Sequence, residues 1–186
     1  MIWPFRKSNP LAPTIAAIYG MIVAQARMPQ FYQAFEVPDT VNGRFDMVVL
    51  HLWVVLRRLR AEGPQAQQLA QGLFDHFCSD MDDNLREMGT GDLAVPRRMR
   101  AFGEAFYGRA TAYDAALADA DPDGLTKALG RNILGMPPED AISRSSVHDL
   151  ADYVRVTLAQ FAACPSEELV TGAWRFPAPK ELARAS

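Results

Sequence analysis

Apolar residues recur at steps of three and four along most of the chain, the spacing of one face of an α-helix. The longest stripe predicts a helix between an Asp39 cap and Gly63-Pro64, with its apolar side chains at Val41, Phe45, Val48, Val49, Leu52, Leu56 and Leu59. Further apolar residues fill the other faces of this helix, so neighbouring helices should surround it. We predict that it is the central helix of the fold.

Other helical segments are predicted on both sides of the central helix. They cover residues 10–27, a short turn opened by Pro29, residues 65–88, a helix opened by Pro96, a modest helix after Asp121-Pro122-Asp123-Gly124, a helix capped by Ser145 or Ser146, and a short turn after Ser166. No stretch shows the alternation of a β-strand. The sequence therefore predicts an all-α fold, a single compact bundle of about six to seven helices.

The ends of the chain are expected to lie outside this bundle. We predict a flexible N-terminus at 1–9, a helical domain at 10–176 and a flexible tail at 177–186. The N-terminal MIWPF segment places aromatic residues ahead of Arg6 and Lys7, a combination that can rest at a lipid headgroup boundary. A frayed terminus is the simpler interpretation, and peripheral membrane contact stays open. The longest apolar run, Met47 to Leu56, is too short to cross a bilayer.

Composition narrows the classes of function. The 186 residues are 49% hydrophobic and carry a formal net charge of −3, so no positive field exists to attract nucleic acid. The two cysteines, Cys78 and Cys164, lie far apart without a CxxC partner, which favours a reducing compartment such as the cytoplasm. We expect a protein without a nucleic-acid partner.

The acidic helix at 65–88 contains one candidate metal cluster. His76, Asp80 and Asp83 are spaced by four and three residues and would project from one helix face. A helical di-iron site, however, would need paired Glu-x-x-His motifs, and no histidine here has a glutamate three residues before it. A solvated acidic face is the favoured interpretation.

His51 interrupts the apolar pattern of the central helix. Imidazole is a common axial ligand of haem, but the chain has no CxxCH attachment motif, so a hydrogen-bonded core histidine is favoured. The Walker, dinucleotide-binding and Gly-x-Ser-x-Gly patterns are also absent. We therefore expect no cofactor and no catalytic residue.

A dense string of short motifs resembles one protein family. The motifs are Val37-Pro38-Asp39-Thr40, Gly43-Arg44-Phe45-Asp46-Met47, Leu50-His51, Phe74-Asp75, Asp80-Met81-Asp82, Asn84-Leu85-Arg86-Glu87-Met88-Gly89, Gly91-Asp92-Leu93 and Glu104-Ala105-Phe106-Tyr107-Gly108-Arg109. Together they resemble the ubiquinol-cytochrome c chaperone family, mainly over residues 26–117. Thr90 departs from the apolar residue expected in the family's loop. The absence of a transit-like extension indicates a bacterial member.

The resemblance implies a non-enzymatic assembly chaperone. Its expected client is newly made apo-cytochrome b, which it would attend at the inner face of the cytoplasmic membrane during assembly of the cytochrome bc1 complex. In mitochondria the family works with the ribosome and a small assembly factor, and these are the further partners that the resemblance suggests. The alternative function is a small helical metal- or haem-binding protein that uses His76 or His51.

Six residues of the matched block are expected to border a client-binding surface, namely Asp80, Asp83, Arg86, Asp92, Tyr107 and Arg109. The competing interpretation is that they stabilise the connection between two helices. The sequence leaves this alternative open.

Overall fold

The structure is a computed structural model that describes residues 9–87 and 89–179. Within these ranges the chain forms helices and no strand, which confirms the predicted all-α class. The predicted MIWPF segment and residues 180–186 of the predicted tail lie outside the described residues.

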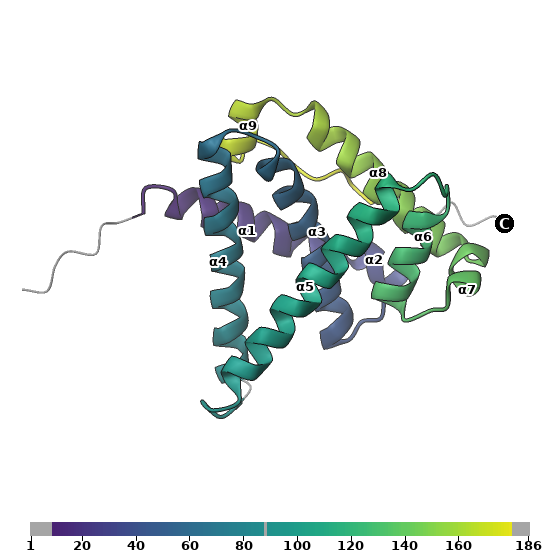
Figure 1. The fold of residues 1–186 in the computed structure, drawn as a ribbon, viewed down its shortest axis with the longest axis horizontal. Helices are drawn as coiled ribbons and strands as arrows, with labels where there is room; N and C mark the ends of the chain where they lie inside the picture. Colours follow the sequence, from purple (N-terminus) through teal and green to yellow (C-terminus); the bar gives the residue numbers. More distant parts are fainter. Residues whose placement is uncertain (1–8, 88, 180–186) are drawn as a thin grey trace, which may run out of the picture.

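Helix α3 (Val41–Arg60) is the centre of the fold, as its pattern predicted. Thirteen of its twenty residues are buried, because helices cover it on several sides. Helices α1 (Ala12–Ala26) and α4 (Pro64–Glu87) both pack against it and against each other. Figure 1 shows α3 inside the molecule, with α4 along one end.

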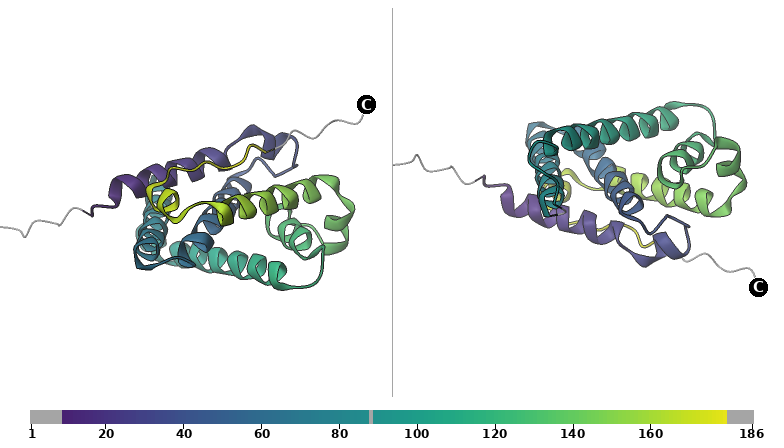
Figure 2. Two further views of the ribbon diagram at one scale, coloured as in Figure 1. Left: turned by 90° about the horizontal axis from the view of Figure 1, so that it is seen from above. Right: turned by 90° about the horizontal axis from the view of Figure 1, so that it is seen from below.

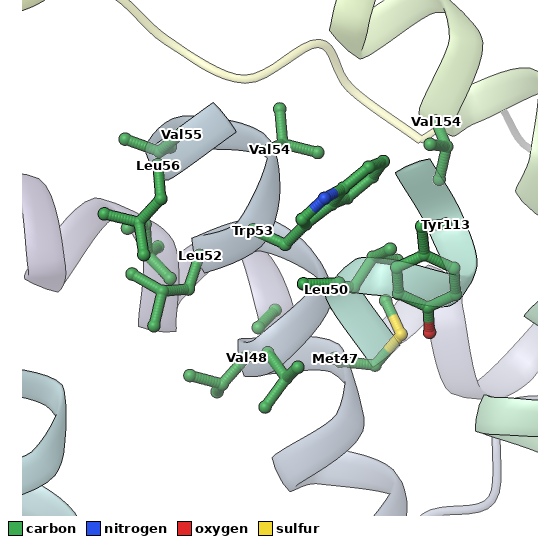
Figure 3. Packing of buried hydrophobic residues seen from close by; sticks show 14 of the residues in the cluster. Met47, Val48, Leu50, Leu52, Trp53, Val54, Val55, Leu56, Tyr113 and Val154 are labelled. Atoms are coloured by element: carbon green, nitrogen blue, oxygen red, sulfur yellow. The ribbon is translucent and has the colours of Figure 1, made fainter. Parts of the chain in front are cut away.

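The helices on either side of α3 form two outer layers. Figure 2 shows α1 and the short helix α2 (Pro29–Gln33) on one side of α3, and α5 (Val95–Ala118) on the opposite side. Figure 3 shows how α5 reaches the core, with Tyr113 next to Trp53 and Met47 of α3. The ring centroids of Trp53 and Tyr113 are 5.1 Å apart.

Short helices close the end of the molecule away from α4. Helix α6 (Gly124–Leu129) continues into a π-helical turn, η1 (Gly130–Leu134), which ends where Gly135 adopts a positive φ of 67°. Helix α7 (Pro138–Ser143), which was not predicted, then begins at a proline. Proline fits the first turn of a helix, where its missing N–H is no loss.

Helix α8 (Ser145–Ala163) and the short helix α9 (Ser166–Thr171) complete the fold near the positions predicted for them. After α9, Trp174 and Phe176 pack against Phe161 of α8, with ring centroids 4.7 and 5.4 Å away. The carbonyl of Pro177 accepts a hydrogen bond from Gln25 Nε2 at 3.0 Å. No helix in the described ranges is both long and apolar enough to cross a membrane.

Two predicted helix caps are wrong, because both helices begin at a different position from the one predicted. Asp39 does not cap α3: it pairs with Arg44 at 2.6 Å, and the neighbouring Thr40 hydroxyl accepts from the amide of Gly43 instead. Neither Ser145 nor Ser146 caps α8, because both lie in its first turn and Arg144 is at the N-cap position. The Ser146 hydroxyl donates to the Glu36 carboxylate at 2.6 Å.

Candidate functional site

The residues predicted to border a functional surface lie on α4, on the connection after it and on α5, which converge at one end of the molecule (Figure 1). Asp80 is turned toward α1, where its carboxylate accepts a hydrogen bond of 2.7 Å from the Tyr19 hydroxyl. Burial, together with this hydrogen bond, raises the pKa of Tyr19. Asp83, one turn further along α4, is exposed. Asp80 therefore ties two helices together, whereas Asp83 faces solvent.

Arg86 organises the connection between α4 and α5. Its Nε donates to Asp82 and its Nη1 donates to Asp92, both at 2.7 Å. The Asp82 carboxylate raises the pKa of Arg86, and Asp92 adds to the effect. The path of the connection is thus held by charged groups that remain accessible to a partner.

Arg109, which was expected to border a client-binding surface, lies on the inner side of α5. Its Nη2 atom is 2.7 Å from Asp46 Oδ1 on α3, and only 22% of the Arg109 side chain and 9% of the Asp46 side chain are exposed. Burial raises the pKa of Asp46 to about 6, because the loss of water outweighs the nearby guanidinium. Arg109 is therefore part of a helix contact.

The polar contact between Asp46 and Arg109 is incomplete. The two charges touch, but Arg109 Nε and the hydroxyl of Tyr113 have no hydrogen-bond partner among the described residues. Tyr113 lies one turn beyond Arg109 on the same face of α5, and its pKa is raised by burial. Polar atoms that lose water without gaining a partner cost free energy, so this part of the interface is poorly stabilised.

Tyr107 belongs to a set of rings shared by α3, α4 and α5, which we call the aromatic cluster. Its members are Phe45, Phe74, Phe77, Phe102, Phe106 and Tyr107. The Tyr107 ring lies 5.7 Å from Phe74 and 5.4 Å from Phe106, yet 52% of the residue is exposed. Leu93, in the connection before α5, is 99% exposed. Apolar groups thus reach the surface around the converging helices.

His51 is a core residue with both ring nitrogens engaged. Its Nδ1 lies 2.7 Å from the carbonyl of Met47, which can only accept, so Nδ1 carries the proton and Nε2 accepts from the Tyr153 hydroxyl at 2.8 Å. Burial lowers the pKa of His51 to about 4, which keeps the ring neutral. This arrangement fits the structural interpretation and leaves no lone pair directed at a haem iron.

The proposed metal ligands of α4 do not form a ligand set. His76 packs edge-on against the ring of Tyr19, with centroids 4.9 Å apart, and Asp80 accepts from the same tyrosine. In residues 9–87 and 89–179, no three His, Cys, Asp or Glu side chains converge in a way that could hold an ion.

The six predicted residues therefore do not share one face. Asp83, Arg86, Asp92 and Tyr107 are accessible, whereas Asp80 points to α1 and Arg109 points to α3. Sequence analysis missed Asp46 as the partner of Arg109, although an acid inside the apolar pattern of a central helix was a signal for a buried pair. It also missed Glu36, whose positive φ of 57° and bond to Ser146 carry no local signal.

Comparison with known proteins decides the family. The sequence model of the family described as ubiquinol-cytochrome C chaperone matches residues 33–176, most of the chain. The chain belongs to the ubiquinol-cytochrome C chaperone family. The matched range includes α3 to α9 and every residue of the aromatic cluster.

Members of this chaperone family from distant organisms resemble the chain. It is 28% identical over 174 residues to the ubiquinol-cytochrome-c reductase complex assembly factor 1 of Xenopus laevis, covering 91% of this chain and 85% of that protein. It is 27% identical over 153 residues to the mitochondrial protein CBP3 of Saccharomyces cerevisiae, covering 80% of this chain but 44% of that protein. Against the mouse and human assembly factors, the chain spans about half of their length.

A solved structure of the family has the same fold. The crystal structure of the Cbp3 homolog from Brucella abortus superposes with a TM-score of 0.78 and is 37% identical in sequence. The match covers 89% of this chain and 90% of that one.

Proposed function

We propose that the chain is an assembly factor of the ubiquinol-cytochrome c reductase complex, also called the cytochrome bc1 complex, and that it acts by binding newly made apo-cytochrome b. The observation that carries the proposal is the family match over residues 33–176. Relatives that align over most of this chain bear names that state a role in assembly of that complex.

The mode of action that fits this role is capture and release. Newly made transmembrane segments expose apolar surface, which aggregates in water. A protein that covers such surface lowers the concentration of the aggregating species without making or breaking a covalent bond. We propose that this occurs at the inner face of the cytoplasmic membrane, where the segments insert.

The end of the molecule where α4 and α5 converge is the surface we propose for the client. It combines exposed apolar groups, Leu93 and Tyr107, with the acidic side chain of Asp83. This end of the molecule carries charges of both signs, because Arg97, Arg98 and Arg100 of α5 are exposed as well. Transmembrane helices carry an excess of Lys and Arg on their cytoplasmic flanks, so the Asp83 carboxylate beside the apolar groups would complement such a residue.

Deleting the gene tests the assembly role. We expect cytochrome b to fall in the reduced-minus-oxidised absorption spectrum of membranes while total haem stays constant. The wild-type gene supplied in trans should restore the cytochrome b signal. Normal cytochrome b in the deletion strain would contradict the assembly role itself.

The surface is tested by two exposed substitutions, Asp83→Lys and Tyr107→Ala. We expect Asp83→Lys to keep the thermal stability of the wild type and Tyr107→Ala to lose a little of it, because the Tyr107 ring packs on Phe74 and Phe106. Both variants should stay folded and co-purify less newly made cytochrome b. Glu167→Lys, the same charge change on the exposed side of α9, is the matched control and should capture client normally. Normal capture by both test variants would place the client elsewhere.

A further inference from the structure

Helix α5 is embedded less deeply than the other long helices. Only four of its 24 residues are buried, Val95, Phe106, Ala110 and Tyr113, whereas thirteen of the twenty residues of α3 are buried. Its outer side is rich in small residues, and a Cβ at Gly108 would meet nothing within 4 Å. Because burial of apolar surface is the main term that holds a helix in place, α5 is held more weakly than α3.

The surface under α5 is aromatic. Phe45 of α3 lies 5.0 Å from Phe102 of α5, and Phe74 of α4 lies 5.1 Å from Phe106. Phe77 of α4, which is buried, completes this surface at 6.2 Å from both Phe45 and Phe106. If α5 moved away, the rings of Phe45, Phe74 and Phe77 would lie side by side and be accessible to a partner.

The polar part of the same interface opposes tight docking of α5. Asp46 and Arg109 are largely removed from water and pair with each other, but Arg109 Nε and the hydroxyl of Tyr113 gain no hydrogen-bond partner among the described residues. Releasing α5 would return these groups to water. Displacement of α5 would therefore restore hydrogen bonds to water at the part of the interface that is least stabilised when α5 is packed in place.

We propose that α5 is a displaceable helix and that the surface of Phe45, Phe74 and Phe77 beneath it receives an apolar helical segment of the client. This inference rests on the proposed function and deepens it. We expect the bound client segment to be a helix because α5, which covers this aromatic surface in the structure, is itself a helix. Helix α5 has 24 residues, and a transmembrane helix has about 20, so the two are similar in length.

The first test strengthens the contact of α5 with α3. The double variant Asp46→Leu with Arg109→Met replaces the incomplete ion pair by apolar side chains, an exchange that tends to preserve or raise stability. We expect hydrogen exchange of α5 amides to slow and capture of newly made cytochrome b to weaken by the same factor. The matched control is Arg57→Met with Asp114→Leu, which alters the exposed ion pair between the same two helices. This control should leave hydrogen exchange of α5 amides and capture of cytochrome b near their wild-type values.

The outcomes separate the two proposals. If the wild-type protein captures no cytochrome b, the proposed function fails. If the wild type captures it and the double variant captures it equally well with slowed exchange, only the displaceable helix is overturned.

A second test does not depend on the stability of the double variant. A photoreactive phenylalanine analogue is placed at Phe77, which α5 covers, or at exposed Val156 of α8 as a control. In samples that contain the client, we expect cross-links from position 77 to the client. In samples without client, we expect cross-links from position 77 to α5. Cross-links from position 77 to α5 alone, in a sample that holds client, would overturn the inference.

Discussion

The carboxylate of Asp46 on α3 lies 2.7 Å from the guanidinium of Arg109 on α5, in a position where both side chains are largely hidden from water. A buried charge needs its partner more than an exposed one does, because water cannot replace it. The stability of the protein should therefore respond strongly when one member is removed.

Arg109→Met leaves the Asp46 carboxylate without its counter-charge. We expect the free energy of unfolding at pH 7.5 to fall by about 2–4 kcal/mol, measured by urea denaturation. Adding Asp46→Leu to the same chain should restore the whole of the loss or exceed it. A single variant as stable as the wild type would show that the pair does not stabilise the fold.

The pH dependence of stability should reveal Asp46 directly. Its pKa in the folded protein, about 6, lies above the unfolded value of about 3.9, so the folded state binds more protons between these values. The resulting stabilisation is fully present below pH 3.9 and is lost as pH rises through 6. Relative to Asp46→Asn, the wild type should lose about 2–3 kcal/mol between pH 4 and 7. A constant difference between the two proteins would contradict the raised pKa.

His51 should produce the opposite trend over nearly the same range. Its folded pKa, about 4, lies below the unfolded value of about 6.5, so stability from this group is present above pH 6.5 and is lost as pH falls through 4. Because the wild type combines both trends, His51 must be isolated with His51→Gln. We expect this variant to be less stable than the wild type at pH 7 and to lose less stability on acidification. Parallel curves for the two proteins would show that the ring is not neutral in the fold.

Two glycine substitutions should shift stability in opposite directions. A Cβ on Gly43 would lie 2.0 Å from the carbonyl oxygen of Pro38, so Gly43→Ala must move the backbone at the start of α3 and should cost about 1–3 kcal/mol. A Cβ on Gly108 meets open space, so Gly108→Ala should stabilise α5 by about 0.5–1 kcal/mol. Thermal unfolding of both variants checks the contrast. Equal shifts in the two would contradict the packing at Gly43.

The long helices could be predicted because each repeats its apolar spacing over several turns. In α3 the apolar residues fill every face, and the helix is indeed enclosed by its neighbours. Helix α7, with six residues, is too short for such a repeat to appear, so it was not predicted.

The partners of polar side chains could not be predicted from local sequence. Asp39 and Ser146 both lie close to the start of a helix, but Thr40 is the cap of α3, and the Ser146 hydroxyl donates to Glu36 through a long-range contact that local spacing does not reveal. The same limit applies to the candidate site. The matched block includes Arg109, but the direction of its side chain depends on Asp46, which lies 63 positions earlier in the chain.

The enclosure of α3 also affects how the protein itself must be synthesised. Helix α3 ends at Arg60, yet part of its cover comes from α8, which begins at Ser145. During translation, the strongly apolar helix α3 therefore leaves the ribosome well before α8, the last helix that covers it, has been synthesised. The proposed chaperone would therefore itself pass through a stage with exposed apolar surface, and slow elongation should make it prone to aggregate.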